Sequence, residues 1–167
     1  KEQFLKKLYA DSNYQISINN NILLDTRLIE SQSNGVGLVL YEASQQLGFE
    51  DMKLSRSILN IANYSYPNLH EVGFLSASLL YSLEFSEEAI RLYKAIPHNH
   101  YLSSLAVIQL ASLLNLNNEE DEAIKALKDY LKVKNNFKVK MTLGDHYRYK
   151  SDWENAQKTY TQIIENE

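Results

Sequence analysis

The chain has 167 residues, of which 44% are hydrophobic, and it contains only two prolines and five glycines, so it fits one helical domain or one piece of a longer array better than a turn-rich β protein. The net charge is −4 and basic residues are dispersed, apart from a modest cluster at 128–140, which argues against nucleic-acid binding because neutralising phosphates requires a basic face. No cysteine occurs, which excludes disulfides, thiol catalysis and Cys-ligated metals.

The first 35 residues carry no repeat. Phe4, Leu5, Leu8 and Tyr9 fall on one face of a predicted short helix, and residues 11–21 are polar and asparagine-rich. Residues 22–30 are a second candidate helix, and 31–37 are a linker or a helix start. We expect residues 1–35 to cap the array that follows or to be a partial repeat of it. The sequence contains no apolar signal segment, so we expect a soluble protein and leave the cytoplasm and the periplasm open.

Three similar segments, each starting with an alanine, recur at a nearly constant distance. Ala89, Ala123 and Ala156 are 34 and then 33 residues apart, and each follows a short acidic stretch. A second small residue precedes each alanine by twelve positions. These second small residues are Ala77, Ala111 and Gly144. The same spacing, extended toward the N-terminus, falls on Ala43 and Ser55, so the pattern predicts four units.

The spacing predicts two amphipathic helices in each unit, A and B, joined by a short acidic turn. Because a small residue lies on each helix at the contact, the two helices can approach closely and pack antiparallel. Acidic residues at the start of each B helix are favoured by the positive end of the helix dipole. The four helix pairs are predicted at residues 36–69, 70–103, 104–136 and 137–167, which gives an all-α chain.

This pattern resembles the tetratricopeptide repeat (TPR), a 34-residue helix–turn–helix unit. The fourth unit matches best, at Leu143, Gly144, Tyr147, Trp153, Ala156, Tyr160 and Ile163. Pro67 falls at the proline that ends a repeat, whereas Gln46, Ser55, Leu114 and Leu127 depart from the usual aromatic or small residues. The resemblance covers residues 36–167. It implies a right-handed superhelical solenoid of antiparallel helix pairs that binds other proteins.

In this family, A-helix residues line a concave groove that accepts an extended segment or a helix. The equivalent positions are Leu40, Tyr41, Ser44, Phe74, Ser78, Tyr81, Ile108, Gln109, Ser112, Met141, Asp145, Arg148 and Tyr149. One position per unit is apolar throughout, namely Leu40, Phe74, Ile108 and Met141, and it either contacts a partner or packs inside the superhelix. Some members grip a peptide carboxylate with Lys, Asn and Arg. Leu40 and Ser44 stand at the equivalent positions, so we expect no such clamp.

The polar clusters fit structural roles better than metal sites. His98 and His100 lie on a turn without a carboxylate pair, which makes a poor zinc site and fits an inter-repeat loop. The acids at 119–122 lack the alternate spacing and the glycine of a calcium loop. His70 and His146 are lone helical histidines. No phosphate loop, nucleophile elbow or zinc-protease motif occurs, so we expect no enzyme activity, no metal and no cofactor.

The partner is expected to be another protein or a peptide. A protein-interaction module, such as a bacterial envelope or assembly scaffold, is the favoured function. A self-associating structural subunit and a noncatalytic part of a larger enzyme or secretion assembly are the alternatives. Membrane insertion is not expected, because the longest stretch without a charged side chain, 97–118, is too polar for a spanning helix.

The last predicted helix carries apolar side chains toward the place of a following helix. These are Tyr160, Ile163 and Ile164. We therefore expect either further repeats or a homo-oligomeric contact through the C-terminal end. The alternative is that Thr159, Gln162 and Glu165 already form an adequate polar cap.

Overall fold

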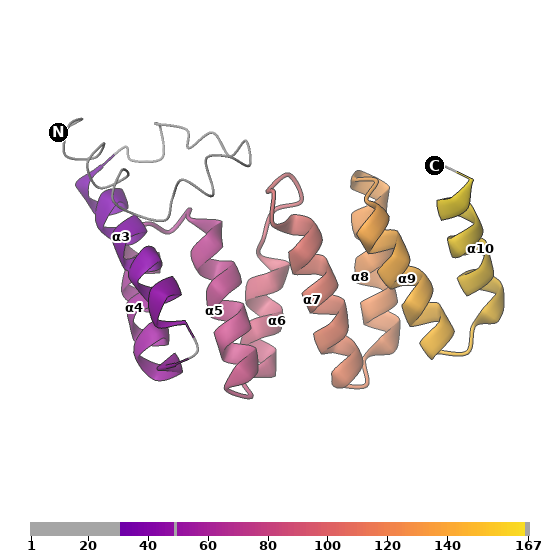
Figure 1. Cartoon of the computed structure of the whole chain (residues 1–167), viewed down its shortest axis with the longest axis horizontal. Coiled ribbons are helices and arrows are strands. Elements are labelled where there is room, and N and C mark those ends of the chain that lie inside the picture. Colours follow the sequence, from indigo (N-terminus) through magenta and orange to yellow (C-terminus); the bar gives the residue numbers. More distant parts are fainter. Residues whose placement is uncertain (1–30, 49, 166–167) are drawn as a thin grey trace.

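A computed structural model describes residues 31–48 and 50–165. Within these ranges the regular secondary structure is helical, and the helices form a row of antiparallel pairs (Figure 1). The A helices are α3 (Gln32–Leu47), α5 (His70–Ser82), α7 (Ser103–Leu116) and α9 (Phe137–Tyr149). The B helices are α4 (Met52–Ser65), α6 (Ser86–Lys94), α8 (Glu120–Val133) and α10 (Trp153–Ile164). The all-α prediction is confirmed, and the two helices expected before residue 31 lie outside the described residues.

The stretch 31–37, which the sequence left as a linker or a helix start, is the beginning of α3. Ser31 caps this helix, because its hydroxyl accepts a hydrogen bond from the Asn34 N–H at 3.1 Å. None of the described helices is long and apolar enough to cross a membrane.

The A–B turns of the last three pairs share one backbone geometry. Each contains one residue with positive φ, and these residues are Glu84, Asn118 and Ser151. The N–H of the next residue donates a hydrogen bond to the carbonyl five positions earlier. These bonds run from Phe85 to Leu80, from Glu119 to Leu114 and from Asp152 to Tyr147, at 2.8–2.9 Å. This is the Schellman arrangement, which satisfies free carbonyls at a helix end. Each turn lies seven residues after its predicted small A-helix residue, so these three units share one register.

The first pair has a different register from the other three. Ser44 and Ser55 are fully buried, and the Ser55 hydroxyl donates to the Ser44 carbonyl at 3.1 Å, whereas Ala43 is only half-buried. The predicted contact between Ala43 and Ser55 is therefore wrong by one residue. The reason is the turn: α3 ends at Gly48, whose N–H bonds to the Ser44 carbonyl at 3.0 Å. A shift of one residue rotates a helix face by about 100°.

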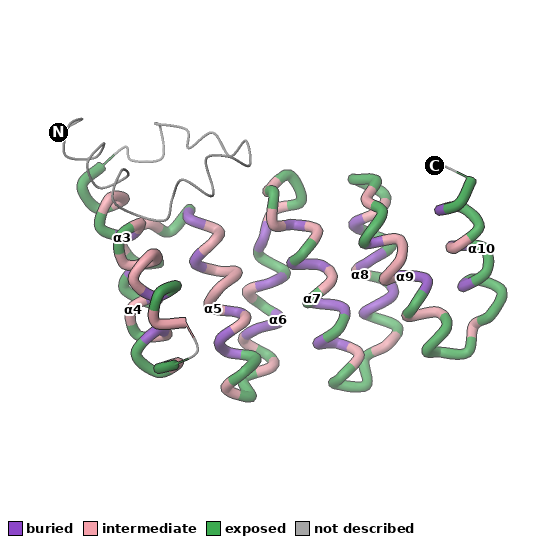
Figure 2. Tube along the Cα trace, viewed as in Figure 1, coloured by how far each residue is buried: buried purple, intermediate pink, exposed green. Residues whose placement is uncertain are grey.

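The core lies between the helices of each pair and between adjacent pairs, while exposed residues gather at the turns (Figure 2). One cluster of buried side chains runs continuously from α5 to α9. A smaller cluster on α4 and α5 includes Leu59, Ala62 and Val72, with α3 side chains packed against it. The predicted small residues of the last three units are all buried. Close helix packing through small side chains therefore produces the stack.

Candidate functional site

The candidate interaction surface is the solvent-facing side of α3, α5, α7 and α9, called the A-helix face below. The predicted apolar stripe runs along it, and Leu40, Phe74, Ile108 and Met141 are all half-buried. The first three pack against the core, and the Phe74 ring meets the Tyr93 ring edge-on at 5.5 Å. The packing and the partner-contact interpretations are thus compatible, because each side chain has one side in the core and another in solvent.

The polar residues predicted in the groove differ in how freely a partner can reach them. Ser78 is half-buried and shares a hydrogen bond with the Tyr93 hydroxyl at 3.0 Å, whereas Gln109 and Ser112 are exposed. The prediction that Ser44 contacts a partner is wrong. Its exposed fraction is 0%, because it lies inside the α3–α4 contact, so a partner cannot touch its side chain.

At the C-terminal end of the A-helix face, the two charged residues bond to each other. Asp145 accepts hydrogen bonds from the Tyr160 hydroxyl at 2.8 Å and from Arg148 at 3.4 Å. Tyr81 and Tyr149 are exposed, so each ring is available as an interface anchor. Tyr41 is half-buried, and its hydroxyl accepts a hydrogen bond from the Gln45 amide at 2.7 Å.

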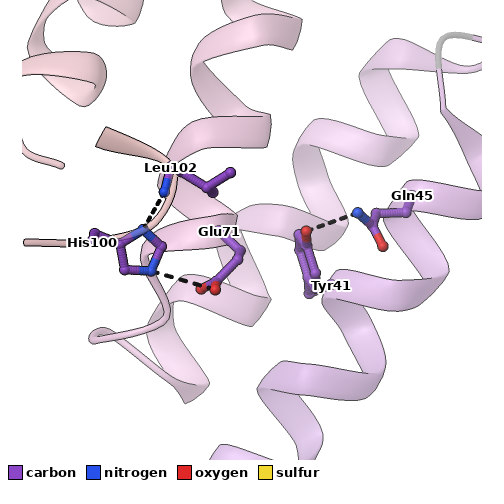
Figure 3. Close-up of polar contacts among 5 residues, drawn as sticks. All are labelled: Tyr41, Gln45, Glu71, His100 and Leu102. Carbon is purple, nitrogen blue, oxygen red and sulfur yellow. Dashed lines mark hydrogen bonds and ion pairs between the residues drawn. The ribbon is translucent and has the colours of Figure 1, made fainter. Parts of the chain in front are cut away.

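A polar cluster that the sequence did not single out lies where α5 meets the loop before α7. The Glu71 carboxylate lies 3.4 Å from Nε2 of His100, and each side chain is only 17% exposed. The other ring nitrogen of His100 accepts a hydrogen bond from the Leu102 N–H at 3.3 Å. Figure 3 shows Glu71 between His100 and Tyr41, so α3, α5 and the loop before α7 all contribute to this cluster.

Burial controls protonation in this cluster. It lowers the pKa of His100, against the opposing effect of the Glu71 charge. Burial also raises the pKa of Tyr41 and of Tyr101, and the negative charge of Glu71 raises both further. Tyr101 is therefore close enough to Glu71 for the carboxylate to act on its hydroxyl. The phenols and the imidazole are therefore neutral near pH 7, and the Glu71 carboxylate is the charge that this group presents.

An apolar groove begins next to this cluster, between the N-terminal ends of α7 and α9. It is lined by Tyr101, Leu102, Ser104, Leu105, Asn136, Phe137 and Lys138. Three of the lining side chains, Tyr101, Leu105 and Phe137, are 43–55% exposed. Apolar side chains exposed together in a hollow are typical of a contact surface.

One signal in the sequence points to part of this region. Glu71, Leu105 and Lys138 each precede a stripe residue by three positions, and residues three apart share a helix face. The A-helix face therefore extends one turn further toward the N-terminal ends of the A helices than the predicted set of residues.

A second hollow lies among α6, α7 and α8. Its floor includes Val107, Leu110 and Leu114, which are nearly fully buried, and its rim carries the ion pair of Lys125 with Glu122 at 3.4 Å. Because these three floor side chains are themselves nearly fully buried, each offers a partner little surface to cover.

No protein-family model matches the sequence, and no curated protein matches it. Solved structures do match in fold. MamA (41-end) from Desulfovibrio magneticus RS-1 superposes with a TM-score of 0.60 and 15% identity over 77% of this chain and 74% of that one. YrrB, described as a TPR protein with an unusual peptide-binding site, superposes with a TM-score of 0.60 and 9% identity over 92% of this chain and 74% of that one. A Podosopora anserina putative kinesin light chain with TPR-like repeats superposes with a TM-score of 0.61 and 13% identity over 77% of this chain and 73% of that one.

The chain has the TPR fold.

The expected resemblance and the superhelical fold class are thereby confirmed. In this TPR array Leu40 is half-buried and Ser44 is fully buried, and the expectation that the chain has no carboxylate clamp stays a prediction. Within residues 31–48 and 50–165, no group of three or more His, Asp or Glu side chains is placed to hold a metal ion.

Proposed function

We propose that this chain is a noncatalytic protein-interaction module that binds a peptide segment or a helix on its A-helix face. The observation that carries the proposal is the half-buried apolar stripe, one residue from each helix pair, with the exposed Tyr81 beside it. One partly exposed apolar side chain from each helix pair gives an extended ligand repeated contacts at the spacing of the solenoid. The peptide-binding site named for YrrB supports a peptide as the ligand class.

The test starts from affinity capture with the intact protein, followed by mass spectrometry and by affinity measurements on the purified partner. Tyr81→Ala and Phe74→Ala should each weaken binding by more than about 1 kcal/mol if these rings are anchors. Phe74 also packs on Tyr93, so its variant needs a thermal melt that shows it remains folded. Tyr81 is exposed and its variant is the cleaner measurement.

The matched control lies on the α7–α8 turn. Reversing the charges at Glu119 and Glu120 should change the affinity little, because both residues are at the start of the B helix α8 and neither belongs to an A helix. The opposite ranking, with the turn variants weakening binding and the aromatic variants not, would move the site to the edge of the solenoid.

Self-association through the C-terminal end is a second candidate. Of the three apolar residues predicted to face a following helix, Ile163 is buried, Tyr160 is half-buried and Ile164 is 75% exposed. The apolar surface open to a second copy at α10 is therefore smaller than the sequence suggested. Light scattering over a range of protein concentrations tests this: a constant monomer mass would rule it out.

A further inference from the structure

We propose that Glu71, with the rings of His100 and Tyr101 beside it, binds the cationic side chain of a lysine or arginine in the partner peptide, while the groove between α7 and α9 takes an apolar side chain of the same peptide. This inference rests on the proposed function and names the chemistry of its ligand. The occupant is a short basic–apolar segment of another protein.

The first argument is the unbalanced charge of Glu71. Among the described residues, the other ion pairs join an acid to a lysine or an arginine, whereas Glu71 is paired with His100. The Leu102 N–H donates to one ring nitrogen of His100, so the ring offers Glu71 a neutral N–H and no full positive charge. A carboxylate that is 17% exposed is weakly hydrated and gains more from an incoming cation than a solvated surface acid does.

The second argument is the set of aromatic rings that pack on His100, the partner of the carboxylate. The ring centroids of His100 and Tyr101 are 4.5 Å apart, and those of His70 and His100 are 5.3 Å apart. The Tyr101 side chain is more than half exposed, so one wall of the cluster is open to a ligand. Aromatic faces attract ammonium and guanidinium groups and add to the attraction of the carboxylate. An acidic side chain or a peptide carboxyl terminus would be repelled here.

The third argument is that Tyr101 belongs to both parts of the site. Its ring stacks at 4.5 Å on His100, the partner of Glu71, and it also lines the apolar groove with Leu105 and Phe137. A ligand that fills both parts therefore carries its cation and its apolar side chain only a few residues apart. Each part alone is small, and simultaneous occupation supplies the affinity and the specificity.

The experiment is an NMR titration of the full, ¹⁵N-labelled chain with acetylated and amidated peptides in which zero to three alanines separate one arginine from one leucine. A parallel set replaces arginine with citrulline, which keeps the shape and removes the charge. The arginine set should shift the amides of Glu71, Tyr101 and Leu105. The citrulline set should bind about tenfold more weakly.

Three variants complete the design. Glu71→Gln should lower the affinity for the arginine peptides by about tenfold, so that they no longer bind more tightly than the citrulline peptides. Tyr101→Ala changes a side chain that is more than half exposed, so it should fold normally and still lose affinity. Glu87→Gln removes an exposed acid from the B helix α6 and is the matched control, expected to leave affinity unchanged. The amide spectrum of each variant reports directly whether it is folded.

Several outcomes would overturn the inference. If the arginine and citrulline peptides bind with equal affinity, and the Phe74→Ala variant still fails to bind them, the chain does not recognise a cation but the proposed function stands. Shifts confined to the hollow among α6, α7 and α8, or no binding by any of these peptides, would count against both. Shifts at Glu71 and Tyr101 that grow with protein concentration in the absence of peptide would assign the site to a second copy of the chain instead.

Discussion

Gly37, Gly73 and Gly144 are three of the glycines in the A helices, and replacing each with alanine should give three different results. Alanine in a helix interior is favoured over glycine by about 1 kcal/mol, so this gain is common to all three variants. The difference comes from the space available for the new methyl group. At Gly73 a Cβ would lie 3.7 Å from the Ile96 side chain, which is ordinary contact. Gly73→Ala should therefore stabilise the protein by up to about 1 kcal/mol.

Gly37 leaves no such space. A Cβ there would lie 2.6 Å from the Tyr66 Cβ, 3.0 Å from the Ala62 carbonyl oxygen and 3.1 Å from the Tyr66 nitrogen. Two of these atoms are backbone, so the clash is relieved only if α3 and α4 move apart. Overpacking of this kind costs about 1–3 kcal/mol, and after the helix-propensity gain is subtracted Gly37→Ala should be destabilised by up to about 2 kcal/mol.

Gly144 is the intermediate case. A Cβ there would lie 2.5 Å from the Tyr160 ring, which is a side chain and can rotate away. The rotation sacrifices the hydrogen bond from the Tyr160 hydroxyl to Asp145, a bond that contributes about 0.5–1.5 kcal/mol. Loss and gain nearly cancel, so Gly144→Ala should lie between the other two variants.

Urea denaturation followed by circular dichroism at 222 nm measures the order of the three variants. Because each helix pair contacts only its neighbours, the α3–α4 pair can open before the rest, and amide hydrogen exchange would locate the loss in Gly37→Ala. If Gly37→Ala proves as stable as Gly73→Ala, the close approach of α3 and α4 described here is refuted.

Three further predictions concern packing, capping and pH. Ala111→Leu or Ala123→Leu should cost about 1–3 kcal/mol, because both alanines are fully buried between helices; unchanged melting temperatures in both would contradict the repeat register. Asn136→Ala should cost about 1 kcal/mol by removing the side-chain cap of α9, whereas Glu119→Ala, at an N-cap without a side-chain bond, should change the unfolding free energy far less in the same urea assay. Burial in the folded chain lowers the pKa of His146 below its usual 6.5, so the unfolded chain takes up this proton at a higher pH than the folded chain does. The free energy of unfolding should therefore decrease as the pH drops below 6.5. His146→Gln should flatten that pH dependence, and an unchanged slope would assign the effect elsewhere.

The sequence by itself determined the repeat. A small residue at a fixed place on each helix is required wherever two helices pack closely, and this requirement recurs with every unit, so Ala77, Ala89, Ala111 and Ala123 revealed the period without any structure. The same period gave the A and B helices and the face on which the apolar stripe lies. Helical periodicity also carried the signal for Glu71, three positions before Phe74, although its significance was not evident from the chain alone.

Only the tertiary structure decided the register of the first pair and which residues form the polar cluster around Glu71. Ser44 replaces Ala43 at the α3–α4 contact because the turn at Gly48 closes earlier than the other A–B turns, and the period of a repeat does not specify how one particular turn closes. Tyr41, Glu71 and His100 come from α3, α5 and the loop before α7, about 30 residues apart along the chain, so no local pattern joins them. How far a carboxylate is buried, and whether its neighbour is neutral, depends on atoms brought together across the stack, because hydration and charge interactions act through space and not along the chain.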